Sequence, residues 1–97
     1  MSDRPTIRHV VFFSARDRSD IPRIVAGLEV LADIPAARHF EVRRNLGSDP
    51  ISPDMDVVVY AEFDSIADLE AYRAHPLYQK SIDIVRPLRD QRIAVDF

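Results

Sequence analysis

The sequence predicts an α+β fold, a ferredoxin-like βαββαβ domain in which helices cover one face of a four-stranded antiparallel sheet. Four short segments rich in β-branched and aromatic residues alternate with segments whose apolar residues recur at helical spacing. In addition, residues 7–13 and 55–63 carry apolar side chains at both odd and even positions, which is typical of strands buried on two faces. Helices can cover only one of these faces. We therefore expect a homodimer, in which a second copy covers the other face.

The composition is that of one globular domain, which we expect to span residues 1–97. The chain is 46% hydrophobic and 30% charged, with a formal charge of −3. Its basic residues are scattered, which argues against nucleic-acid binding, and its apolar runs are too short to span a membrane. The absence of cysteine excludes disulfides and thiolate sites and fits a reducing cytoplasm.

The first strand is expected over residues 7–13, followed by a helix with Ser19 or Asp20 as its cap. Pro22 suits the first turn of this helix, because proline lacks the amide hydrogen that is unpaired there in any case. The helix is expected to end near Ile34. Its apolar stripe consists of Ile21, Ile24, Val25, Leu28 and Leu31.

Two strands follow, separated by the one long loop of the chain. Apolar and polar residues alternate over residues 38–46, which is typical of an edge or exposed strand. Residues 47–54 contain turn formers and two prolines, and predict the loop. Residues 55–63 predict the third strand.

The second helix is expected to start at Ser65, whose hydroxyl stands three residues before Asp68 as in a capping box. It should break at His75-Pro76, because proline disfavours the helical conformation of the preceding residue but suits the start of a new helix. Residues 92–97 predict the last strand. The two parts of the helix carry the stripes Ile66, Leu69 and Tyr72 or Arg73, and Leu77, Ser81, Ile84, Val85 and Leu88.

Five segments of the sequence resemble the stress-responsive A/B barrel family. They are residues 7–13, 61–65, 68–72, 75–78 and 95–97, and together they cover nearly the whole chain in order and spacing. The resemblance implies a dimeric α+β barrel. Most members of the family have no assigned chemistry, so the resemblance alone implies no reaction.

One member of this family, a plant polyketide cyclase, closes a linear polyketide by an intramolecular aldol step without metal or cofactor. It uses a histidine assisted by a tyrosine in a pocket between helices and sheet. The resemblance places that tyrosine at Tyr72, a strand histidine at His9, and the catalytic histidine at Tyr78. A tyrosine can donate a hydrogen bond to a carbonyl or enolate oxygen as it is, but it would have to ionise far below its usual pKa of about 10 to act as a base near pH 7.

The candidate catalytic residues are therefore His9, Tyr72 and Tyr78, and the candidate ligand-binding residues are the same three with His75. Histidine has the pKa that a general base needs at neutral pH. Structural interpretations remain open for each of them. His9 shares its strand face with apolar residues and suits a packed core, His75 suits a helix cap, and the tyrosines suit amphipathic packing.

Two functions are compatible with these residues. One is a small-molecule binder or cofactor-free enzyme with a pocket for an aromatic or polyketide-like ligand. The other is a non-enzymatic stress-associated dimer, and a barrel monooxygenase is a third possibility. We expect no metal, because Asp49, Asp54 and Asp56 lack EF-hand spacing, and no nucleotide cofactor, because Gly27 and Gly47 are the only glycines.

Overall fold

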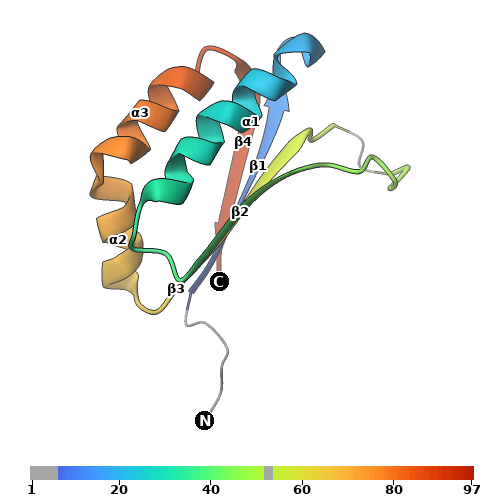
Figure 1. Cartoon of the computed structure of the whole chain (residues 1–97). Helices are drawn as coiled ribbons and strands as arrows, with labels where there is room; N and C mark the ends of the chain where they lie inside the picture. The colour runs from blue at the N-terminus through green and yellow to red at the C-terminus, as the bar shows by residue number, and fades with distance from the viewer. Residues whose placement is uncertain (1–6, 52–53) are drawn as a thin grey trace.

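The computed structural model describes residues 7–51 and 54–97, so residues 52–53 of the predicted loop lie outside the described part. In chain order the elements are β1 (Ile7–Ala15), η1 (Arg18–Asp20), α1 (Ile21–Glu29), η2 (Val30–Asp33), β2 (His39–Arg44), β3 (Val57–Phe63), α2 (Ile66–Ala74), α3 (Pro76–Val85) and β4 (Arg89–Asp96). The strands form one antiparallel sheet of order β2-β3-β1-β4. The three α-helices lie over one face of this sheet (Figure 1). The predicted ferredoxin-like βαββαβ architecture is confirmed.

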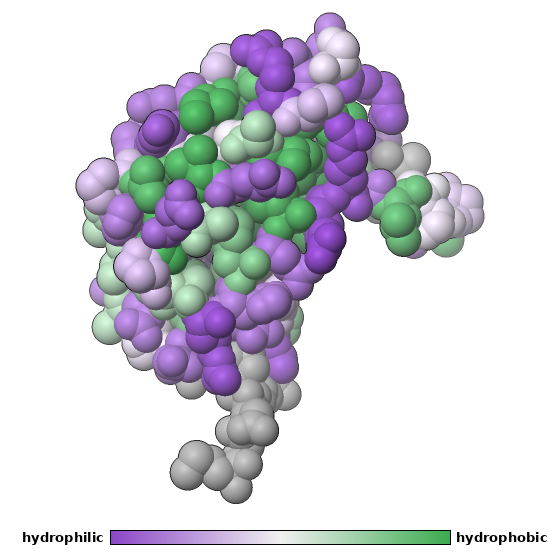
Figure 2. Space-filling model, viewed as in Figure 1, coloured by the Kyte–Doolittle hydropathy of each residue, from purple (hydrophilic) through white to green (hydrophobic). Residues whose placement is uncertain are grey.

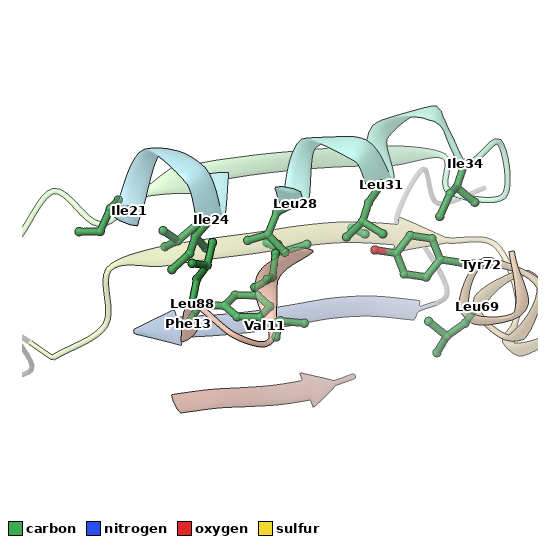
Figure 3. Packing of buried hydrophobic residues seen from close by; sticks show 14 of the residues in the cluster. Val11, Phe13, Ile21, Ile24, Leu28, Leu31, Ile34, Leu69, Tyr72 and Leu88 are labelled. Carbon is green, nitrogen blue, oxygen red and sulfur yellow. The ribbon is translucent and has the colours of Figure 1, made fainter. Parts of the chain in front are cut away.

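The hydrophobic core lies between the helices and the covered face of the sheet (Figure 3). Every second residue of β1 and β3 points into it, as the strand period requires. Each large apolar side chain buried there contributes about 1.5–3 kcal/mol. The core residues include Val11, Phe13, Ile24, Leu28, Leu31, Val57, Val59, Ala61, Phe63, Leu69 and Tyr72.

The entry to α1 differs from the prediction. Asp17, rather than Ser19 or Asp20, provides the side-chain cap, and its carboxylate accepts a hydrogen bond from the Ser19 amide at 2.9 Å. This bond stabilises the 3₁₀ turn η1, so that Asp20 precedes α1 without a side-chain cap bond. Pro22 lies in the first turn of α1 as predicted, and the last part of the predicted helix is the 3₁₀ turn η2.

The break at His75-Pro76 is confirmed. The Ser65 hydroxyl accepts a hydrogen bond from the Asp68 amide at 3.1 Å and caps α2, as predicted. His75 has extended backbone, and its Nδ1 accepts a hydrogen bond from the Leu77 amide at 3.1 Å. His75 is therefore the N-cap of α3, and Pro76 is its first residue.

Two apolar residues of the predicted helix stripes are exposed, and two others, Val25 and Leu77, are half-buried. Ile66 is 61% exposed because it is the first residue of α2 and precedes the turn that reaches the core. Ile84 is 37% exposed and lies at the contact between α1 and α3, beside Gly27. A Cβ atom at Gly27 would lie 2.7 Å from Cγ2 of Ile84, so the glycine permits the close approach of these helices.

Strand boundaries also differ from the predicted ones. β2 and β3 are shorter than the predicted ranges 38–46 and 55–63, whereas β4 begins at Arg89 rather than at residue 92. The extra residues of β4 continue its pairing with β1 as far as Ala15, beyond a register shift. No helix in the described ranges is long and apolar enough to cross a membrane.

The face of the sheet that the helices leave open is apolar on β1 and β4. Val10 and Phe12 lie on this face of β1, and the register pairs them with Val95 and Ile93 of β4. Phe12, Ile93 and Val95 are all exposed. The sheet therefore presents an uncovered apolar surface opposite the helices, which is what the two-sided strand pattern predicts.

The segment between β2 and β3 projects from the body of the molecule (Figure 1). It carries the exposed apolar residues Leu46 and Ile51, and Figure 2 shows hydrophobic atoms on the part that projects. Gly47 in this segment has a φ of 72°, which glycine adopts without strain.

Candidate functional site

A cavity of about 270 Å³ lies between the helices and the covered face of the sheet. β1 and β3 form its floor, and α1, η2, α2 and α3 contribute the residues above it. Most of its inner wall is apolar, which suits a hydrophobic ligand body. The apolar part consists of Val11, Phe13, Leu28, Leu31, Val59, Ile82 and Val85.

Three of the four predicted site residues line this cavity, namely His9, Tyr72 and Tyr78. Their rings form a row, since the Tyr72 ring centroid lies 6.0 Å from that of His9 and 5.3 Å from that of Tyr78. They come from β1, α2 and α3, so only the folded chain brings them together. The fourth residue, His75, is not among the lining residues and caps α3 instead.

His9 is only 1% exposed and is hydrogen-bonded through Nδ1 to Asp96 Oδ1. The strand register places Asp96 of β4 directly opposite His9 of β1. The other carboxylate oxygen accepts a hydrogen bond from Arg73 Nη2 at 2.9 Å. A carboxylate beside Nδ1 keeps the proton on that nitrogen, which leaves Nε2 as the basic atom of the ring.

Asp96 is ionised near neutral pH. Partial burial alone would raise the pKa of its carboxyl, but the hydrogen bonds from His9 and Arg73 outweigh burial and hold that pKa below its usual value. A carboxylate in this position stabilises the imidazolium that forms when the histidine accepts a proton. Asp96 was not predicted as a site residue, and its only signal in the sequence is the position of an acidic residue near the end of the last strand.

Tyr72 is suited to donate a hydrogen bond rather than to act as a base. Burial, with a smaller contribution from nearby Tyr78, raises the pKa of the Tyr72 hydroxyl well above its usual value. Its ring packs against Phe63, at a centroid distance of 5.0 Å, and points into the layer between α1 and the sheet (Figure 3).

Tyr78 lies toward the outer part of the cavity. Arg92 Nη2 donates a hydrogen bond to its hydroxyl at 3.4 Å. Arg86 and Arg89 line the cavity beside it. None of these three arginines was predicted as a site residue, because the basic residues are scattered along the chain. Their spacing of three along residues 86–92 is the signal that the sequence offers.

The arrangement combines a basic atom, hydrogen-bond donors and an apolar wall. His9 Nε2 can accept a proton, and the hydroxyls of Tyr72 and Tyr78 can donate to an oxygen that gains negative charge. Within residues 7–51 and 54–97, no group of three or more histidine, aspartate or glutamate side chains is placed to hold a metal ion. A basic nitrogen beside two hydroxyl donors is an arrangement suited to polarising a carbonyl group.

Comparison with protein families finds that the model of the Stress responsive A/B Barrel Domain matches residues 7–97. Comparison with curated proteins finds no match.

Solved structures share the fold. A dimeric ferredoxin-like protein of unknown function from Thermobifida fusca is 27% identical, with 94% of this chain and 88% of that chain covered and a TM-score of 0.79. A Dabb family protein with a ferredoxin-like fold from Mesorhizobium loti is 24% identical, with 97% and 96% covered and a TM-score of 0.82. A putative antibiotic biosynthesis monooxygenase from Nitrosomonas europaea is 15% identical, with 95% and 96% covered and a TM-score of 0.76.

Proposed function

The chain belongs to the stress-responsive A/B barrel domain family, and we propose that it forms a homodimer and that each copy binds a small aromatic or polyketide-like molecule. The ligand occupies the cavity between the helices and the sheet, and the partner covers the open face. The observation that carries the proposal is that His9, Tyr72 and Tyr78, from three separate elements, line one largely apolar cavity.

The open face of the sheet supports the homodimer. Phe12 of β1 and Ile93, Val95 and the terminal Phe97 at β4 expose apolar area there. A second copy would bury the same patch in both molecules, as a two-fold symmetric interface does. The similar protein from Thermobifida fusca is described as dimeric.

Cofactor-free aldol ring closure is the second candidate function, and the His9–Asp96 pair favours it. His9 Nε2 would remove a proton from the carbon next to a carbonyl group, and the Tyr72 hydroxyl would donate to the enolate oxygen. The enolate carbon would then attack a second carbonyl of the same molecule, and the resulting alkoxide would take the proton back from His9. A barrel monooxygenase is a third possibility, supported by the shared fold with the Nitrosomonas europaea protein.

A titration followed by methyl NMR tests the binding proposal. Aromatic and polyketide-like compounds are added to the isotopically labelled protein, and we expect shifts confined to methyl groups that line the cavity, such as those of Val11, Leu31 and Val85. Binding to Tyr72→Phe should be about 3- to 10-fold weaker, as for one lost neutral hydrogen bond.

Tyr60→Phe is the matched control, because it removes the same atom from the open face, where the Tyr60 hydroxyl bonds to Glu62. It should leave ligand affinity unchanged. Shifts that spread over the surface, or equal losses in both variants, would contradict a ligand site in the cavity.

A further inference from the structure

Three arginine side chains, Arg86, Arg89 and Arg92, line the outer part of the cavity. They extend from the end of α3 into the start of β4. No aspartate or glutamate is among the described residues that line the cavity. Within the described ranges, the ion pairs engage other arginines or histidines, and none joins these three to a carboxylate. The cavity therefore has a cationic mouth whose charge its own lining does not neutralise.

Structural roles account for part of this cluster only. Arg86 follows the last turn of α3, where the helix dipole stabilises a positive charge. Arg92 reaches the Tyr78 hydroxyl, which is neutral. Arg89 is half-buried, and burial together with the charges of Arg92 and Arg86 lowers its pKa. Holding three cations together, one of them partly buried, is unfavourable unless an anion joins them.

We propose that the cavity takes a small organic carboxylate, whose carboxylate group binds Arg89 and Arg92 at the mouth and whose apolar body extends inward beside Tyr72. This inference rests on the proposed function, since it names the class of ligand for the same cavity. The planar guanidinium matches a carboxylate with two parallel hydrogen bonds.

The strand register gives the backbone distance between the two ends of the cavity along β1. Phe13 pairs with Arg92 and His9 pairs with Asp96, so the arginine end and the histidine end of the cavity lie four residues apart on β1. At about 3.3 Å per residue this is roughly 13 Å. A ligand anchored by its carboxylate at the mouth would thus extend toward His9 and Tyr72 with its opposite end.

A singly charged headgroup fits the cavity better than a phosphate does. The walls beyond the arginines are largely apolar, and the cost of removing charge from water rises steeply with the charge. The volume of about 270 Å³ is below the range of about 300–1,000 Å³ that is usual for drug-sized ligands, so the body is small.

Isothermal titration calorimetry with matched probes tests the inference on the unmodified protein. The probes are benzoate, octanoate and 2-naphthoate, each compared with its neutral amide, which has nearly the same shape. We expect at least one carboxylate to bind about 10- to 100-fold more tightly than its amide, as for hydrogen bonds to a charged group. Inorganic phosphate, an anion without an apolar body, should bind more weakly than that carboxylate.

The double variant Arg89→Gln/Arg92→Gln should abolish the preference for the carboxylate while leaving the affinity for the amide unchanged. Arg44→Gln is the matched control, because Arg44 is exposed on β2 and does not line the cavity. It should keep the full preference. The comparison of acid with amide on the unmodified protein stands even if the double variant fails to fold.

The outcomes separate the two proposals. Equal binding of a carboxylate and its amide would overturn the carboxylate inference while supporting a ligand cavity. Phosphate binding as tight as that of the best carboxylate would also overturn it, because a bare anion would then suffice. If no carboxylate and no amide binds, both this inference and the proposed function are contradicted.

Discussion

At the scale of single residues, Asp96 links the two ends of the chain to the candidate site. It joins His9 of the first strand and Arg73 of α2 through its two carboxylate oxygens. One residue therefore holds the orientation of the histidine ring and the proton on its Nδ1. His9 and Asp96 are 87 positions apart in the sequence, so only the folded sheet brings them into contact.

Asp96→Asn tests this role through the pH dependence of stability. The pKa of Asp96 is lower in the folded protein than in the unfolded chain, so its contribution to the free energy of unfolding is present above the ordinary value of about 4. That contribution is lost as the pH falls through the folded-state pKa. We expect the variant to be less stable than the unmodified protein at pH 7, with the difference shrinking below about pH 4. Urea denaturation at several pH values measures it.

Glu70→Gln is the control for Asp96→Asn, because Glu70 is exposed on α2 and its substitution removes the same charge without touching His9. Its effect on the free energy of unfolding at pH 7 should be smaller. A stability difference for Asp96→Asn that stays constant from pH 7 to pH 3 would contradict the assigned role.

At the scale of secondary-structure elements, His75 separates α2 from α3, at the break that the sequence predicts. The residue caps α3 through its side chain, so we expect His75→Ala to lower the free energy of unfolding by about 0.5–2 kcal/mol. His75→Asn provides a side-chain oxygen that can accept the hydrogen bond from the Leu77 amide in place of Nδ1. It should therefore recover most of the lost free energy of unfolding. Chemical denaturation gives both values.

The same pair of variants separates capping from ligand binding by His75. If the residue only caps α3, His75→Asn should bind cavity ligands as the unmodified protein does. Weakened binding in the asparagine variant with normal stability would show a direct contact with ligand, which the capping role does not predict.

Gly27 sets the distance between α1 and α3, and its substitution tests their packing. Its Cβ would meet Cγ2 of Ile84 at 2.7 Å and Cγ2 of Val85 at 2.9 Å. Both neighbours are β-branched and have little rotamer freedom in a helix. Gly27→Ala should therefore destabilise the protein by about 1–3 kcal/mol from overpacking, less the roughly 1 kcal/mol that alanine gains in helix propensity.

A double-mutant cycle with Ile84→Ala checks the cause, because that change removes the atom nearest to the new methyl group. Gly27→Ala should cost less in the Ile84→Ala background than alone. A net stabilisation in the otherwise unmodified protein, as at an unhindered helix position, would show that the two helices are not closely packed there.

At the scale of the whole molecule, the fold was predictable because it rests on local patterns. Apolar residues at both odd and even positions of residues 7–13 and 55–63 indicated strands buried on both faces. Ser65 and Pro76 indicated where helices begin. Helix caps were less predictable where several small polar residues lie close together in the sequence, as Asp17, Ser19 and Asp20 do. Each of these side chains can accept a hydrogen bond from a backbone amide at the start of a helix.

The candidate site was predictable only in part. His9, Tyr72 and Tyr78 were proposed from a family resemblance, and the structure brings them to one cavity. Asp96 and Arg89 escaped prediction because their places depend on the pairing of the last strand with the first. That register, including the shift near Ala15, is set by tertiary packing rather than by any local pattern.

The open face makes a prediction about the whole molecule as well. Phe12→Asp places a charge at the centre of the apolar patch, where a dimer would bury it unpaired. We expect this variant to dissociate into monomers at concentrations at which the unmodified protein is a dimer, as measured by light scattering. Ile66→Asp, on an exposed position of α2, is the control and should remain dimeric.

The central claim is that the sheet is covered twice, by its own helices on one face and by a second copy on the other. Sedimentation equilibrium of the unmodified chain at micromolar concentration tests it most directly. We expect a species with twice the 11.1 kDa mass of one chain. A stable, folded monomer at that concentration would contradict it.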